Sequence, residues 1–282
     1  KGIPFHHEQA ASIAAESSTR IKNNIGVAIV TTGPGSSNAL TGLLGSWIES
    51  LPLIIVSGQV KTTDINKKIE LRQQGVQGAN ILSMVKKITK YSVQLKKKDN
   101  FKIILDKAIS IAKNGRPGPV WIEVPLDVQS MLVRKKEIKI KINKKEKFAF
   151  SNKIKNKIKK LLEKSKRPVF LIGHGVRLSS ANKDFIKLIN KLKIPCVFTW
   201  NAMDALEHNH SLNFGRPGVV AQRYSNFVVQ NSDLLISIGC RIDNIITAFN
   251  EKNFAKYAKK IIVDIDKNEL KKFSFKNSLK LN

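Results

Sequence analysis

The chain has 282 residues, 42% of them hydrophobic, and a formal net charge of +29 from 50 lysines and arginines against 21 acidic residues. This length and apolar content suffice for two globular domains. Its apolar runs are far shorter than the roughly 20 residues of a membrane-spanning helix, and the start of the chain lacks the basic-then-apolar order of a signal peptide, so we expect a soluble, cytoplasmic protein with no membrane partner.

The basic charge and the two cysteines do not by themselves indicate a nucleic-acid partner, a disulfide or a metal site. A strongly basic chain can bind nucleic acid, but the densest basic stretch, residues 134–160, contains no aromatic residue before Phe148. We therefore expect a solvated basic surface and no nucleic-acid partner. Cys196 and Cys240 lie in apolar runs without CxxC spacing, which predicts buried thiols and neither a disulfide framework nor a metal site.

The first 134 residues alternate helical and strand-like segments. A helix of small residues is predicted over 8–22, then a βαβ unit: a strand at 27–30, a glycine-rich turn at 32–35, a helix at 38–49 and a strand at 53–56. A polar loop (58–78), helices at 81–86 and 99–114, and a strand at 120–124 follow. This order predicts a parallel sheet covered on both faces.

Residues 135–152 are rich in lysine and predict a linker, after which a second α/β pattern occupies 153–282. We expect helices at 152–165, 180–192, 219–229 and 253–257, strands at 168–172, 195–199, 234–238 and 261–264, and no strand after the last of these. The predicted fold class is α/β, with two doubly wound parallel-sheet domains, the second Rossmann-like.

Two features of the first domain could carry chemistry. The turn Gly33-Pro34-Gly35-Ser36-Ser37-Asn38 joins a strand to a helix, where backbone amides can receive a ligand, although such turns also serve as plain corners. It has neither a dinucleotide fingerprint nor a P-loop lysine. Glu8 begins a helix, where a carboxylate also favours the helix dipole, and the adjacent His6 and His7 cannot form a metal pair by themselves.

The order of several motifs resembles the acetolactate synthase family of thiamine-diphosphate enzymes. Residues 3–130 are similar to its pyrimidine-binding domain through segments 7–11, 32–38, 52–60, 88–90, 115–120 and 124–129. The second part is similar, more loosely, to the middle domain through segments 167–168, 173–175, 230–235, 239–243 and 264–266.

The resemblance implies roles for particular residues. Glu8 would be the catalytic glutamate that hydrogen-bonds the pyrimidine ring nitrogen of thiamine diphosphate, in an apolar pocket whose burial raises its pKa. Pro34 and Asn38 would line the pyrimidine pocket, and Gln77 would face the reaction centre. Val76 stands where these enzymes often carry phenylalanine, which leaves the acceptor substrate open.

The implied reaction is the decarboxylation of a 2-oxo acid, pyruvate, and its ligation to a second 2-oxo acid, giving acetolactate for branched-chain amino acid biosynthesis. FAD would contact Gly175, Arg241, Asp264 and Asp266 in the middle domain. Against flavin, the turn 215–218 lacks the family's histidine, and a middle domain that only spaces the catalytic domains stays an alternative.

The resemblance also implies a fragment. The start of the pyrimidine domain and the C-terminal diphosphate domain, which binds Mg²⁺, are not found in the sequence, so we expect no activity from this chain alone. The family's site lies between subunits, which implies a homodimer or homotetramer. The alternatives are another thiamine-diphosphate 2-oxo-acid decarboxylase or lyase, and a non-catalytic flavin-binding module.

Overall fold

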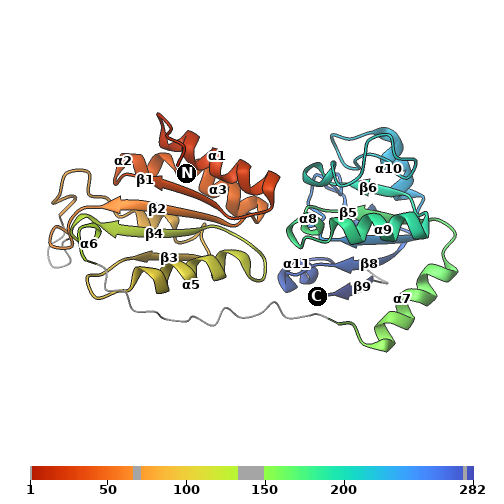
Figure 1. Cartoon of the computed structure of the whole chain (residues 1–282). Coiled ribbons are helices and arrows are strands. Elements are labelled where there is room, and N and C mark those ends of the chain that lie inside the picture. Colours follow the sequence, from red (N-terminus) through yellow and green to blue (C-terminus); the bar gives the residue numbers. More distant parts are fainter. Residues whose placement is uncertain (1, 66–70, 133–148, 276–277) are drawn as a thin grey trace. The chain divides into compact units, whose positions relative to one another are not determined.

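The computed structural model describes residues 2–65, 71–132, 149–275 and 278–282 (Figure 1). The chain divides into two compact units, residues 1–145 and 146–282. Residues 135–148 of the expected linker lie outside the described residues. No helix in the described ranges is both long enough and apolar enough to cross a membrane.

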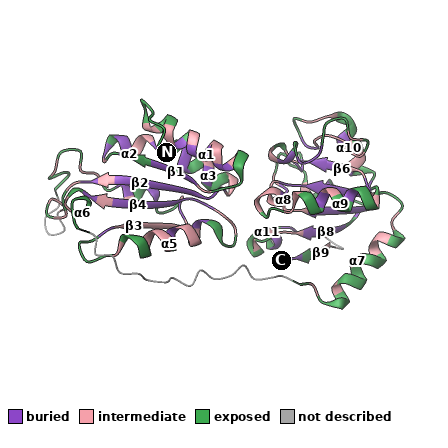
Figure 2. Ribbon diagram, viewed as in Figure 1, coloured by how far each residue is buried: buried purple, intermediate pink, exposed green. Residues whose placement is uncertain are grey.

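The first unit is built on a four-stranded parallel sheet of order β1-β2-β4-β3. Its buried side chains form two clusters, one led by Leu43 and Ile55 and the other by Ala108 and Ile122. Figure 2 shows the strands β2 and β4 as the most deeply buried part of this unit. Its elements in chain order are α1 (Glu8–Lys22), β1 (Gly26–Val30), α2 (Pro34–Asn38), α3 (Leu40–Glu49), β2 (Leu53–Gln59), α4 (Ile81–Val85), β3 (Tyr91–Gln94), α5 (Phe101–Lys113), β4 (Val120–Pro125) and α6 (Leu126–Gln129).

Helix α1 is fixed at its start and along one face. The side chain of His7 caps it by accepting a hydrogen bond from the amide of Gln9 at 3.1 Å, which satisfies one of the free amides of the first turn. Small residues then allow close approach: a Cβ added at Gly42 of α3 would lie 2.5 Å from the carbonyl carbon of Ser12. The position of Glu8, the first residue of α1, therefore depends on this packing.

The second unit contains a five-stranded parallel sheet of order β6-β5-β7-β8-β9, with a core cluster on each face. Cys196 and Cys240 are both buried within these clusters, as predicted, and burial raises the pKa of each thiol to about 12. The elements of this unit are α7 (Asn152–Lys164), β5 (Pro168–Ile172), α8 (Gly175–Leu178), α9 (Asn182–Leu192), β6 (Cys196–Phe198), η1 (Trp200–Ala202), α10 (Arg223–Gln230), β7 (Leu234–Ile238), η2 (Glu251–Asn253), β8 (Lys259–Val263), α11 (Lys267–Lys271) and β9 (Ser278–Leu281).

The two parallel α/β sheets confirm the predicted fold class, but several elements differ from expectation. The glycine-rich turn is itself helical, because α2 begins at Pro34 and runs through Asn38. Strand β3 was not predicted. The helix expected at 253–257 is wrong: a short 3₁₀ turn, η2, occupies 251–253. Strand β8 is not the last, since α11 and β9 follow it and β9 pairs with β8.

Candidate functional site

The turn 33–38 lies at the carboxyl end of β1, beside the carboxyl end of β2. Strands of a parallel sheet all end at one edge, and this edge is where α/β folds bind ligands. The loops that follow β1 and β2 therefore meet there. The sequence places Thr32, Gly33 and Pro34 after β1, and Val60 after β2.

Glu8 contacts the turn 33–38 directly. Its Oε2 accepts a hydrogen bond from Nδ2 of Asn38 at 3.1 Å. A Cβ added at Gly35 would lie 2.5 Å from Cγ2 of Thr31 and 2.8 Å from Oε1 of Glu8, so the carboxylate lies closely against the backbone of this glycine. The helix α1 and the turn after β1 thus form one polar contact from residues 30 positions apart.

The carboxyl group of Glu8 is partly exposed, and its pKa lies below the usual value. The main cause is the hydrogen bond from Asn38, which stabilises the charged form. Burial does act to raise this pKa, as expected, but the hydrogen bonds outweigh it, because the described residues cover the carboxylate only in part.

Gln77 lies on the other side of the same turn. Its backbone is left-handed, with φ of 62°, and its carbonyl oxygen accepts a hydrogen bond from Oγ1 of Thr32 at 3.4 Å. Gly33 also has a positive φ, 59°, and a Cβ there would collide with this carbonyl oxygen. The turn therefore joins Asn38 to Glu8, and the backbone of Gln77 contacts its first residues, while the neighbouring Val76 is 86% exposed.

A buried polar network behind the turn was not predicted. Nε2 of Gln59 donates to Oε1 of Glu123 at 3.2 Å, and Nε2 of Gln94 donates to Oε2 of Glu123 at 3.1 Å. Oε1 of Gln59 accepts from Oγ1 of Thr32 at 3.2 Å, which connects the network to the turn. Burial raises the pKa of Glu123 to about 7.

The predicted flavin contacts in the second unit follow three neighbouring strands. Gly175 comes after β5, Arg241 after β7, and Asp264 and Asp266 after β8. The connection from β5 to β6 runs to one side of β5 and the return to β7 to the other, so the strand order reverses at β5 and β7. This is the switch point at which doubly wound sheets bind nucleotide cofactors.

Hydrogen bonds already engage several of these residues. Oδ1 of Asp264 accepts from the amide of Asp266 at 2.8 Å, and Asp266 caps α11 by accepting from the amide of Asn268 at 2.9 Å. Arg241 lies 3.5 Å from the carboxylate of Asp243. A Cβ at Gly175 would lie 2.7 Å from Cα of Gly239, so backbone packing alone accounts for that glycine.

The turn 215–218 is held from within the second unit. Oε1 of Gln222 accepts a hydrogen bond from the amide of Arg216 at 2.8 Å. Gly218 has φ of 128°, and a Cβ there would lie 2.5 Å from the carbonyl oxygen of Ile245. Within the described residues, no group of three or more histidine, cysteine or acidic side chains is arranged to hold a metal ion.

Two family models match the chain. The model described as "Thiamine pyrophosphate enzyme, N-terminal TPP binding domain" matches residues 1–89, and that described as "Thiamine pyrophosphate enzyme, central domain" matches residues 156–278. The first match contains the turn 33–38 with Glu8 and Gln77. The second contains Gly175, Arg241, Asp264 and Asp266.

The chain is also similar to curated large subunits. It is 36% identical to the probable acetolactate synthase large subunit of Methanococcus aeolicus over 272 residues, which cover 94% of this chain and 44% of that protein. It is 32% identical both to the acetolactate synthase large subunit of Lactococcus lactis and to the isozyme 1 large subunit of Escherichia coli. Each of these alignments covers 96% of this chain and 46% of the relative, so the chain spans less than half the length of these relatives.

Proposed function

The chain belongs to the thiamine pyrophosphate enzymes, of which it carries the N-terminal and central domains, and from this premise we propose that it acts in acetolactate synthesis. The reaction would join two molecules of a 2-oxo acid, pyruvate, with loss of carbon dioxide. The names of the similar large subunits support this substrate class.

The contact between Glu8 and the turn 33–38 carries the proposal. It presents a carboxylate and the amide of Asn38, joined at 3.1 Å, beside the backbone of Gly35. Carboxylate and amide groups can together recognise a nitrogen heterocycle that has both donors and acceptors. This donor set fits the aminopyrimidine of thiamine diphosphate, which supports its binding here.

Four residues would then each have a role in binding or catalysis. Glu8 would hold a proton between its carboxylate and a ring nitrogen, Asn38 would orient that carboxylate, and Pro34 would pack against the ring. Gln77, through its side chain, would contact the 2-oxo acid from the loop above Gly33. The bound cofactor supplies an electron sink that allows a 2-oxo acid to lose carbon dioxide.

Glu8 needs further cover for this role. A shared proton requires a carboxyl pKa near that of its partner, and burial supplies such a rise. In the described residues the carboxyl is partly exposed and its pKa is lowered. We propose that a second subunit covers it in a homodimer or homotetramer, and that residues outside this chain bind Mg²⁺ and the diphosphate.

We also propose that the second unit binds FAD at the edge formed by the carboxyl ends of β5, β7 and β8. Arg241 offers a guanidinium for a phosphate, and Asp264 offers carboxylate oxygens for a ribose hydroxyl. Arg241→Ala should lower the flavin content of the purified protein about tenfold, measured by visible absorbance, since one charge-assisted pair is lost. Arg223→Ala on α10 is the control; equal flavin in both variants would contradict this site.

Product formation tests the proposed reaction. The full polypeptide that the gene encodes, supplied with thiamine diphosphate, Mg²⁺ and FAD, should convert pyruvate to acetolactate, and omission of thiamine diphosphate should abolish the conversion. The 282-residue chain alone should form none. If a folded, cofactor-loaded protein leaves pyruvate unchanged, the acetolactate proposal is wrong.

The exposure of Val76 supports one alternative function. It is 86% exposed beside Gln77, where a larger aromatic side chain would narrow the space for an acceptor substrate. The alternative is a decarboxylase or lyase of the same family that uses another 2-oxo acid or another acceptor. Release of carbon dioxide from a 2-oxo acid without acetolactate would favour it.

A further inference from the structure

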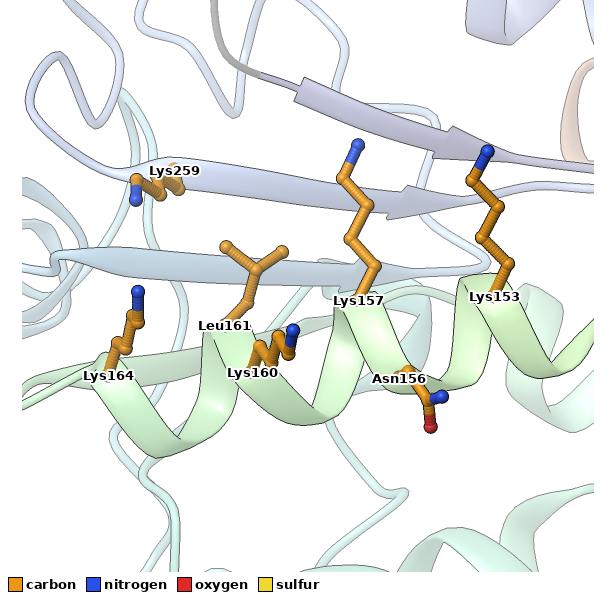
Figure 3. Close-up of a pocket in the computed structure, with 7 residues that line it drawn as sticks. All are labelled: Lys153, Asn156, Lys157, Lys160, Leu161, Lys164 and Lys259. Atoms are coloured by element: carbon orange, nitrogen blue, oxygen red, sulfur yellow. The ribbon is translucent and has the colours of Figure 1, made fainter.

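A groove of about 600 Å³ lies on the second unit between α7 and the start of β8. Figure 3 shows lysine side chains along α7 extending toward the sheet, with Lys164 and Lys259 pointing toward one another. Five lysines line it, together with one amide and one leucine; the seven residues are Lys153, Asn156, Lys157, Lys160, Leu161, Lys164 and Lys259.

The spacing of the lysines on α7 produces this row. Four of them recur at intervals of four, three and four residues, from Lys153 to Lys164, which places them on one side of the helix. At a rise of about 1.5 Å per residue the row extends roughly 16 Å. Apolar side chains of the same helix, among them Ile154 and Ile158, pack against the core, so the row is held beside the sheet.

The charge of the groove is unbalanced. Among the described residues no carboxylate lines it, and none of its five ammonium groups forms an ion pair. The ion pair on α7 within that part of the chain joins Lys159 and Glu163 at 3.7 Å, and neither residue lines the groove. Several like charges around one concavity raise its potential and attract a multivalent anion.

We propose that this groove binds a chain of phosphate groups, either an inorganic oligophosphate or the phosphate chain of a nucleotide. Lysine binds phosphate oxygens as a point charge, and a phosphate chain brings several negative charges into a narrow space. The volume falls within the range of small-molecule sites, about 300–1,000 Å³. In the part of the chain that the structure describes, no aromatic side chain lines the groove to stack a base, so the chemistry favours the phosphate chain over single-stranded RNA.

Calorimetric titration with inorganic triphosphate at low salt tests this site. The unaltered chain is compared with the triple variant Lys153→Gln, Lys157→Gln, Lys160→Gln. This variant should have a dissociation constant for triphosphate that is higher by about tenfold or more. The matched control is Lys183→Gln, Lys187→Gln, Lys191→Gln on α9. It removes the same charge from exposed positions of another helix in the same unit and should change the constant less than about twofold.

Titrations with ATP, at higher salt and with single-stranded RNA also test the groove. ATP should bind as tightly as triphosphate, and the affinity for both should fall as salt rises. The proposal is overturned by equal losses in the two triple variants, by ATP binding more than about tenfold tighter than triphosphate, or by binding of single-stranded RNA alone. Both triple variants should keep the melting temperature of the unaltered chain, because all six lysines are exposed.

Discussion

At the scale of single residues, Glu123 is a buried carboxyl group that hydrogen bonds connect to the candidate site. It is 1% exposed and is held by Gln59 and Gln94, and Gln59 in turn is bonded to Thr32. Burial disfavours its charged form and raises its pKa from 4.5 to about 7. The ionised carboxylate therefore lowers the stability of the fold that positions the turn 33–38.

This shift predicts a pH dependence of stability. The folded pKa exceeds the unfolded one, so the stability from Glu123 is present below pH 4.5 and is lost as pH rises to about 7. Glu123→Gln cannot ionise and lacks this loss. Its free energy of unfolding, measured by urea denaturation, should improve relative to the unaltered chain between these pH values and level off above them; a difference that is constant with pH would contradict the shift.

At the scale of elements, the packing of α1 against α3 sets the position of Glu8, and two glycines of α3 offer a matched test. A Cβ at Gly42 would lie 2.5 Å from the carbonyl carbon of Ser12, whereas a Cβ at Gly45 would meet nothing within 4 Å. Gly42→Ala should lower the free energy of unfolding by about 1–3 kcal/mol. Gly45→Ala should raise it by about 0.5–1 kcal/mol through helix propensity, and equal effects in denaturant titrations would refute this packing.

The elements also show what the sequence could predict. Strands β5 and β7 were predicted with the observed bounds because each is a mainly apolar run, nearly all of it buried. Strands β3 and β9 were missed because they are short edge strands with mixed polar residues and partial burial. The pattern of an edge strand is weak, since only one neighbour and part of one face constrain its side chains.

The residues of the candidate site also fall into those that the sequence predicted and those that it did not. Glu8, Asn38 and Gln77 were predicted because their motifs occur in a recognisable order, and the fold brings all three to one turn. The network of Gln59, Gln94 and Glu123 gave no such signal. These are single polar residues on three strands, and only the strand register, which pairs Gln94 with Glu123, brings them together.

At the scale of the whole molecule, the chain carries two domains of a thiamine pyrophosphate enzyme and spans less than half of the relatives it matches. Part of its net charge of +29 is concentrated at one place, because five lysines line one groove of the second unit. The proposed catalysis depends on Glu8 in the first unit and the proposed phosphate site on α7 in the second. Glu8→Gln should therefore leave triphosphate binding unchanged.

The central claim is that Glu8 is the catalytic carboxyl group, and the turnover number for acetolactate formation by Glu8→Gln tests it most directly. In the full polypeptide this variant should lose about 10²–10⁴-fold in kcat, because its amide cannot share a proton as a carboxyl group does. Glu49→Gln, at the far end of α3 from the turn 33–38, should keep the unaltered rate. A folded Glu8→Gln protein that forms acetolactate at the unaltered rate would contradict the account.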